Sequence, residues 1–250
     1  MRPVSRGSSP QGVTFNNYRD SFDYLLDRMG IGEYKTIKIA QYCSYCERVI
    51  STNLAVEHIE PKDGAFGKPN LKNTWSNFLL ACVNCNSHKS SKQVLFQNLY
   101  LPDRDNTFAA FEYNINGEVK PSNDLDIDQK RIAQNTINLV GLNEPIETDV
   151  DGVAKDRRTQ RLNAISLALD SLEDLKLAPQ NQAVKNLIVK GMLANGYFSI
   201  WMKVFDGYPE IRNMFIDSIR GTRKSGCFDQ NGQIIKPHPN LDKLADGGKL

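Results

Sequence analysis

The sequence has no apolar run that approaches the roughly 20 residues that a membrane-spanning helix needs. Its first residues also lack the apolar core of a secretory signal peptide. These two absences predict a cytoplasmic protein without membrane association. A phosphate-binding loop of the pattern Gly-x-x-x-x-Gly-Lys-Ser/Thr is absent too, because the nearest string, Gly64-Ala-Phe-Gly67-Lys68, has the wrong spacing. If the activity uses nucleotide energy, another chain must supply it.

An excess of charge of one sign is also missing. The formal net charge is only +2 over 250 residues, with 40% hydrophobic and 24% charged residues, which is typical of a globular protein. Any nucleic-acid contact must therefore come from local basic clusters. Histidine is scarce as well. A metal site made of three histidines would use all 3 in the chain, including His238 in a polar tail.

Four of the five cysteines form two Cys-x-x-Cys pairs, Cys43-Ser-Tyr-Cys46 and Cys82-Val-Asn-Cys85. In a reducing compartment such pairs hold metal rather than disulfides. Two pairs at this spacing suit one tetrahedral Zn²⁺. Taken alone, the cysteines are equally compatible with a structural zinc module that binds protein or nucleic acid without catalysis. Cys227 has no cysteine nearby in the sequence and is predicted to be an inert, packed thiol.

The segment between the two pairs carries polar residues that a plain zinc ribbon does not need. Glu57 offers a carboxylate oxygen and Asn86 an amide oxygen, and such ligands favour Mg²⁺ or Mn²⁺ over zinc. His58 offers a neutral imidazole that can accept a proton from an attacking water. The alternative for His58 is a structural histidine with satisfied hydrogen bonds. Its position beside Glu57 and before Pro61 favours the role of a base.

Three strings resemble the HNH endonuclease family with paired zinc cysteines: Val56-Glu57-His58-Ile59-x-Pro61, Trp75-x-Asn77-Phe78-Leu79 and Cys85-Asn86-x-x-Lys89. The resemblance implies a ββα-metal fold, in which a hairpin and a helix hold one divalent ion. It implies that His58 is the general base, that Glu57 and Asn86 are ligands of the catalytic ion, and that Asn77 orients the base and fixes the hairpin. The family more often has Asp at the position of Glu57, and Asn86 is a substitution seen in the zinc-knuckle branch.

Further strings, including Asn77-Phe-Leu-Leu-Ala-Cys82 and Leu101-Pro-Asp-Arg-Asp-Asn106-Thr, resemble a bacterial HNH subfamily of anti-phage systems of the Septu type and of some retrons. This resemblance implies an effector nuclease in phage defence with an ABC/SMC-like ATPase partner. DNA is favoured over RNA as substrate. The alternatives are a non-catalytic zinc-knuckle protein that binds nucleic acid or serves as an adaptor, and an RNase that acts on tRNA.

Hydrophobic periodicity and turn residues predict an α+β protein, and the HNH resemblance implies a small ββα-metal core within it. We expect an N-terminal arm and helix at 1–36, the HNH core with its zinc knuckles at 37–100, and a hairpin followed by a mainly helical region, which could dock a partner, at 101–250. Within the core, 54–59 is predicted as a strand, 75–80 as its hairpin return and 83–93 as a helix. The tail from Asn231 is predicted to be poorly ordered.

The basic residues at the end of the motif and beyond it have two possible roles. Lys89 and Lys92 are predicted to contact the nucleic-acid backbone, although a solvated helix face is the alternative. An ordinary solvated face is also the favoured interpretation of two later clusters, with a phosphate track as the alternative; these are Lys155, Arg157, Arg158 and Arg161, and Arg220, Arg223 and Lys224. One apolar stripe, Leu162, Ile165, Leu169 and Leu172, is predicted to face the core.

Overall fold

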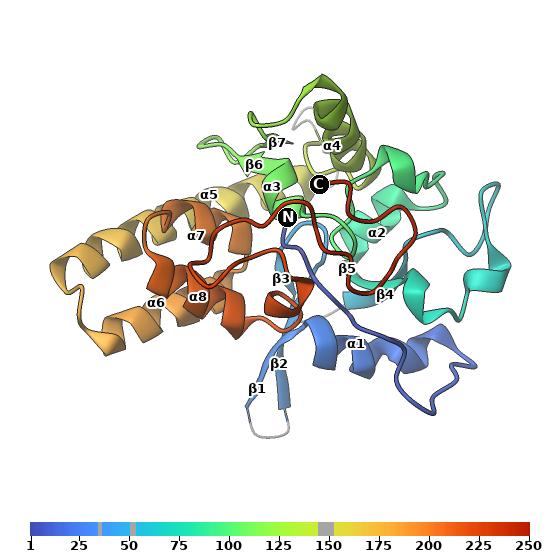
Figure 1. The fold of residues 1–250 in the computed structure, drawn as a ribbon, viewed down its shortest axis with the longest axis horizontal. Coiled ribbons are helices and arrows are strands. Elements are labelled where there is room, and N and C mark those ends of the chain that lie inside the picture. The colour runs from blue at the N-terminus through green and yellow to red at the C-terminus, as the bar shows by residue number, and fades with distance from the viewer. Residues whose placement is uncertain (35–36, 51–53, 145–152) are drawn as a thin grey trace.

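The computed structural model describes residues 1–34, 37–50, 54–144 and 153–250 (Figure 1). Small antiparallel sheets lie in the first half of the chain and most of the helices in the second half, which is the α+β class predicted from the sequence. The helices are α1 (Phe22–Met29), α2 (Val83–Lys89), α3 (Thr107–Ala110), α4 (Ile127–Leu139), α5 (Val153–Leu177), α6 (Gln182–Asn195), α7 (Phe198–Val204) and α8 (Pro209–Ser218). The strands are β1 (Ile31–Tyr34), β2 (Ile37–Tyr42), β3 (Val49–Ile50), β4 (Leu54–His58), β5 (Phe78–Cys82), β6 (Phe111–Tyr113) and β7 (Val119–Pro121).

The predicted ββα unit is present. Strand β4 pairs with β5 in an antiparallel register that sets Glu57 opposite Leu79 and His58 opposite Phe78. Helix α2 begins directly after β5. It ends at Lys89, earlier than predicted, and the following Ser90 has φ of 46°. Because α-helical residues have a negative φ of about −60°, this positive φ takes the chain out of the helix at Ser90.

The N-terminal helix is also present, but the sheet that follows it was not predicted. A 3-10 turn, Tyr18–Ser21, leads into α1, which ends at Gly30 as expected. Strands β1, β2 and β3 then form an antiparallel sheet in that order. Figure 1 shows the β1–β2 hairpin projecting from the body of the molecule.

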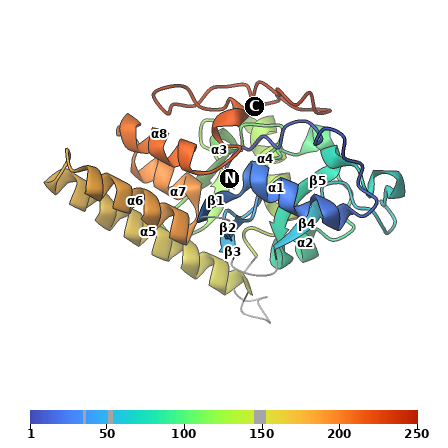
Figure 2. The same ribbon diagram turned by 90° about the horizontal axis from the view of Figure 1, so that it is seen from below.

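The C-terminal region contains the predicted hairpin, β6–β7, which follows the short helix α3, and the helices α4 to α8 come after the hairpin. The sequence Asp126-x-x-Gln129 forms a capping box that starts α4, because each side chain hydrogen-bonds the other residue's backbone N–H. Helices α5 and α6 form an antiparallel pair that extends to one end of the molecule (Figures 1 and 2).

The apolar stripe predicted for α5 is only partly correct. Leu162 and Leu169 are exposed, whereas Ala164, Ala168 and Leu175 are buried. Small side chains allow neighbouring helices to approach closely, and α5 packs against both α6 and α7. Two arginines of α5 are buried as well, so an apolar pattern based on leucine does not reveal the buried face of this helix.

Both ends of the chain are tied into the fold. The side chain of Arg2 is buried and donates to the carbonyl of Met29 and to the hydroxyl of Thr222. The tail also packs, contrary to the prediction of poor order. The backbone carbonyl of Leu250 accepts a hydrogen bond from the N–H of Asn106, and Figure 2 shows the dark red tail along one face of the molecule. Contacts between residues so distant in sequence cannot be inferred from the polar composition of a tail.

One hydrophobic cluster contains residues from all three predicted segments. It joins Met29 of the first, Phe78 of the second, and Leu142 and Leu250 of the third. A second cluster lies mainly among α5 to α8 and is centred on aromatic residues such as Trp201 and Phe205. None of the helices in the described ranges is both long enough and apolar enough to cross a membrane.

Candidate metal centre and active site

The four paired cysteines meet at one point. Cys43 and Cys46 lie in the loop between β2 and β3, Cys82 ends β5, and Cys85 lies in the first turn of α2. Their sulfur atoms all lie within 4.8 Å of one another, and all four residues are buried. This is a donor set that fits a single tetrahedral metal ion. Burial raises the pKa of the Cys43 thiol, so a bound cation is needed for all four sulfurs to ionise together.

Two arginines lie beside the sulfur cluster, and neither was foreseen from the sequence. Arg157 of α5 is buried; its Nη1 donates to Cys85 Sγ at 3.8 Å and its Nη2 to the carbonyl of Gly141 at 2.7 Å. Burial lowers the pKa of Arg48, but the nearby thiols of Cys46 and Cys82 outweigh it and raise that pKa overall. Two guanidinium groups are thus placed where a metal with four thiolates would carry negative charge.

His58 is held in a defined orientation at the end of β4. Its Nε2 lies 2.8 Å from the carbonyl oxygen of Lys72. A carbonyl only accepts hydrogen bonds, so Nε2 must carry the proton and Nδ1 has the free lone pair. The ring packs edge-on against Tyr18 and Phe78. Burial lowers the pKa of His58, which favours the neutral imidazole that a general base requires.

Asn77 fixes the loop of the β4–β5 hairpin. Its side-chain oxygen accepts from the N–H of Glu60 at 2.8 Å, and its amide donates to the carbonyl of Glu60 at 2.9 Å. The predicted anchoring of the hairpin therefore has a geometric basis. The contact that orients the ring of His58, however, comes from the carbonyl of Lys72. Since a backbone carbonyl is common to every residue type, no sequence signal could have identified Lys72.

Glu57 points to the opposite face of β4, where it meets Lys89 of α2. The two side chains are 1% and 2% exposed, and Lys89 Nζ lies 3.1 Å from Glu57 Oε1. Burial raises the pKa of Glu57 to about 7, although Lys89 and Tyr45 lower it. Glu57 Oε2 is buried without a hydrogen-bond partner. An unpaired carboxylate oxygen of this kind fits the role of a ligand for a hard divalent cation.

A cavity of about 690 Å³ opens along β4 and α2. His58, Asn86 and Lys89 line it, and Glu57 lies just outside it as the partner of Lys89. The structure thus brings the predicted base and the predicted ligand Asn86 to one cavity. Lys89 differs from the expectation of a solvent-facing contact, because it is buried. Lys92 is exposed and lines a separate, smaller cavity.

Other candidate residues have structural contacts. His88 pairs with Glu144 and reaches the carbonyl of Asn138, so it ties α2 to the end of α4. Arg161 is buried and donates to the carbonyls of Gly117 and Leu142. Burial of Arg157 and Arg161 argues against a phosphate track on this side of α5. Cys227 is buried outside the sulfur cluster, and burial raises its pKa to about 12, as expected for an inert thiol.

Comparison with known proteins agrees with this geometry. The HNH endonuclease family profile matches residues 43–92, which include the four cysteines, β4, β5 and α2. A predicted HNH endonuclease of retron Vc95 from Vibrio cholerae serotype O1 biovar El Tor is 31% identical over 112 residues. The match covers 42% of this chain and 53% of that protein, so the chain spans about half the length of its relative. Residues 43–92 thus form an HNH endonuclease domain.

Proposed function

We propose that this chain is a metal-dependent endonuclease that hydrolyses phosphodiester bonds in nucleic acid. The observation that carries the proposal is the anchoring of His58: its Nε2 is held by the carbonyl of Lys72, and its side chain lines a cavity of about 690 Å³. Nδ1 of the neutral ring takes a proton from the attacking water. Asn77 supports this arrangement indirectly, by holding the hairpin loop that follows His58.

The metal ions have separate proposed roles. We assign Zn²⁺ to the four-cysteine group, because a closed set of four thiolates is typical of structural zinc. We assign an exchangeable Mg²⁺ or Mn²⁺ to Glu57 and Asn86; such an ion would polarise a phosphoryl oxygen and stabilise the leaving oxygen. The buried, unpartnered Oε2 of Glu57 supports this assignment.

The substrate and the biological role extend the proposal further. We propose DNA in preference to RNA, an effector role in bacterial anti-phage defence, and an ABC/SMC-like ATPase as partner. Support comes from the relative, whose name places it in a retron. The region from residue 101 onward, outside the matched HNH segment, is the proposed docking region for such a partner.

Incubation of the purified protein with labelled DNA and RNA, tRNA included, tests the proposal in the presence of Mg²⁺. The reactions are run with and without the product of a neighbouring ATPase gene. His58→Ala should lower the cleavage rate by about 10²–10⁴-fold, while zinc content and melting temperature are retained. His88→Ala is the matched control, because His88 does not line the cavity, and it should still cut.

Two outcomes would contradict the proposal. A His58→Ala protein that cuts at the wild-type rate would remove His58 from the role of base. Absence of cleavage on every substrate, with and without the ATPase, would favour a zinc-knuckle protein that binds nucleic acid or acts as an adaptor. Cleavage confined to tRNA would replace DNA by RNA as the substrate.

A further inference from the structure

The cavity beside His58 is lined by both polar and apolar side chains. Leu54, Val56 and His58 alternate along β4 and line the same cavity, which therefore follows about 13 Å of strand at roughly 3.3 Å per residue. Phe22 of α1 adds a further apolar side chain. Asn86 belongs to the polar lining near the end of the HNH motif. A phosphate alone would contact only the polar side chains. The apolar side chains therefore favour a ligand that also has an apolar face.

Tyr18 provides an aromatic ring at the same cavity. Its ring centroid lies 4.7 Å from that of His58, at an interplanar angle of 69°. Lys62 Nζ lies 4.2 Å from the centre of the Tyr18 ring, and the guanidinium carbon of Arg19 lies 5.7 Å from it. All three residues line the cavity. An aromatic ring with two cations next to the predicted base matches the pairing of stacking platform and phosphate contacts that single-stranded nucleic acids require.

Tyr18 and Arg19 lie outside the matched segment 43–92, in the turn before α1. They are therefore additions to the HNH domain made by the N-terminal part of the chain. The cavity volume of about 690 Å³ falls within the usual range for small-ligand pockets, so one nucleotide fits it, whereas a stacked base pair within a duplex does not enter such a site. A base reaches a pocket of this kind only when it is unpaired or extruded from the helix.

We propose that this cavity binds one unpaired nucleotide next to the scissile phosphate, with the base against Tyr18 and the adjacent phosphates at Arg19 and Lys62. The inference rests on the proposed nuclease function and specifies its substrate class: single-stranded nucleic acid, or a duplex opened at the cut site. Fully paired duplex is bound and cut less well. Asp63 also lines the cavity, so the basic character comes from particular side chains rather than from a uniformly positive wall.

Binding measurements in the presence of a chelator test the inference without cleavage. Fluorescence anisotropy compares three labelled oligonucleotides of one sequence: single-stranded, fully paired, and paired except for one bulged base. The wild type should bind the single strand and the bulge more tightly than the duplex. Tyr18→Ala should weaken single-strand binding by about 5- to 100-fold, the usual effect of removing one stacking aromatic. Tyr18→Phe keeps the ring and should retain the preference.

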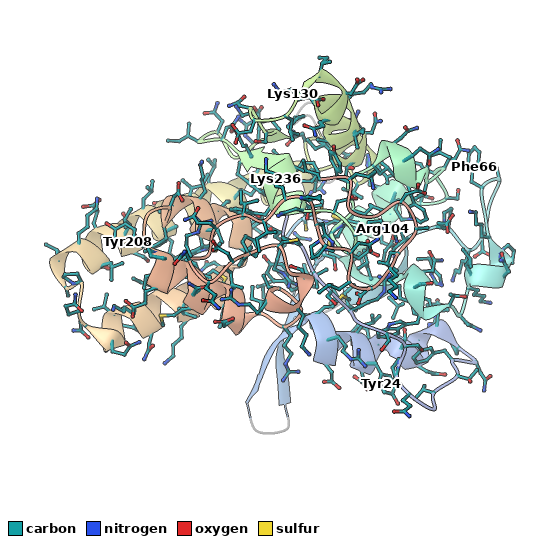
Figure 3. The ribbon with its side chains drawn as sticks, viewed as in Figure 1. Tyr24, Phe66, Arg104, Lys130, Tyr208 and Lys236 are labelled. Carbon is teal, nitrogen blue, oxygen red and sulfur yellow. The ribbon has the colours of Figure 1, made fainter. Side chains whose placement is uncertain are left out.

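Two further variants serve as controls. Phe66→Ala removes an exposed aromatic at the outer edge of the molecule that does not line this cavity, and its binding should match the wild type (Figure 3). Arg19→Gln changes an exposed side chain and leaves packing intact, so it tests the site even if Tyr18→Ala fails to fold. It should weaken single-strand binding. The slope of log affinity against log salt concentration should also fall, by about one released counterion.

Equal affinity for duplex and single strand, or unchanged binding in Tyr18→Ala or in Arg19→Gln, would overturn the inference. This binding test and the cleavage test of the proposed function can fail independently, because binding is measured with a chelator present, so that no cleavage occurs. A protein that binds single strands through Tyr18 but never cuts would contradict the nuclease proposal and leave the nucleotide site in place.

Discussion

Lys89 Nζ lies 3.1 Å from Glu57 Oε1, and both side chains are almost completely buried. The helix of the ββα unit thereby places a cation on the one carboxylate that we assign to the catalytic ion. A buried charge pair of this kind is stable only while both partners remain, because a single buried charge has lost its hydration without compensation. Lys89 also lines the cavity, so the pair lies at the boundary between the core and the proposed active site.

Breaking this pair should destabilise the fold. Lys89→Met and Glu57→Gln should each lower the free energy of unfolding, by about 3–5 kcal/mol where the remaining charge stays buried. The double variant should lose less than the sum of the single variants, because it leaves no unpaired charge. Urea unfolding of the four proteins at pH 8, above the raised pKa of Glu57, gives the coupling energy. Strict additivity of the two single changes would show that the contact is not formed.

Chelation should separate the two proposed metal ions. Glu57 and Asn86 supply few protein ligands, so water fills the remaining positions and affinity for Mg²⁺ is modest. A mild chelator should stop cleavage without removing the cysteine-bound zinc, and added Mg²⁺ or Mn²⁺ should restore it. Glu57→Gln should raise the Mg²⁺ concentration needed for half-maximal cleavage, whereas Glu118→Gln, an exposed control, should not. Cleavage that persists in excess chelator with zinc bound would exclude a second metal.

Loss of one knuckle cysteine should unfold the HNH domain. Cys82→Ser removes one of four sulfurs that lie within 4.8 Å of one another, and structural zinc contributes directly to folding free energy. We expect less than one zinc per chain by metal analysis and loss of structure over at least residues 37–100. Cys227→Ser is the matched control, since Cys227 is a buried thiol outside this cluster. An intact Cys82→Ser protein with unchanged melting would contradict the zinc assignment.

We expect Arg157 of α5 to strengthen metal binding by the four cysteines. Its guanidinium donates to Cys85 Sγ at 3.8 Å, so it stabilises the charged thiolate. Outer contacts of this kind typically change metal affinity by about 10- to 100-fold. Arg157→Met should therefore speed zinc release to a colorimetric chelator.

Arg161→Met separates this effect from simple loss of packing. Arg161 is buried on the same helix, but the acceptors of its guanidinium are the carbonyls of Gly117 and Leu142. Both variants should melt at lower temperature, and only Arg157→Met should lose zinc faster. Equal rates of zinc release in the two variants would assign Arg157 a packing role alone.

Acid should lower the stability of the fold by weakening the contact of Asp103 with Arg6 in the N-terminal segment. Burial raises the pKa of Asp103, but Arg104 and Arg6 outweigh it and bring that pKa down to about 2. The unfolded chain has an ordinary aspartate pKa of about 3.8. This carboxylate therefore stabilises the fold above about pH 4 and loses its contribution as the pH falls toward 2.

The shift corresponds to about 2 kcal/mol. Urea unfolding from pH 7 down to pH 2 measures it, and Asp103→Asn should have a flatter profile between pH 4 and 2. The variant should also be less stable at pH 7, because Arg6 Nη2 lies 2.9 Å from Asp103 and would lose its partner. Parallel pH profiles for the two proteins would show that folding does not lower the pKa of Asp103.

The spacing of neighbouring residues in the sequence was sufficient to predict several features of this protein. The two Cys-x-x-Cys pairs, the strand that starts at Leu54 and the helix end at Gly30 were all predicted from the sequence, because each depends on residues a few positions apart. Family resemblance over residues 42–89 then predicted the roles of Glu57, His58 and Asn86. A sheet formed by β1, β2 and β3 was missed, since strands this short carry little periodic signal.

Only the tertiary structure decided which side chains meet across the chain. It brought Arg157 to Cys85, Tyr18 to His58 and Lys89 to Glu57, and it attached to the fold a tail that was predicted to be poorly ordered. The physical reason is common to these cases. A basic, aromatic or polar residue has the same appearance in a sequence whether it faces water or a buried partner, and the difference is set by long-range packing that decides which charges lose their solvent.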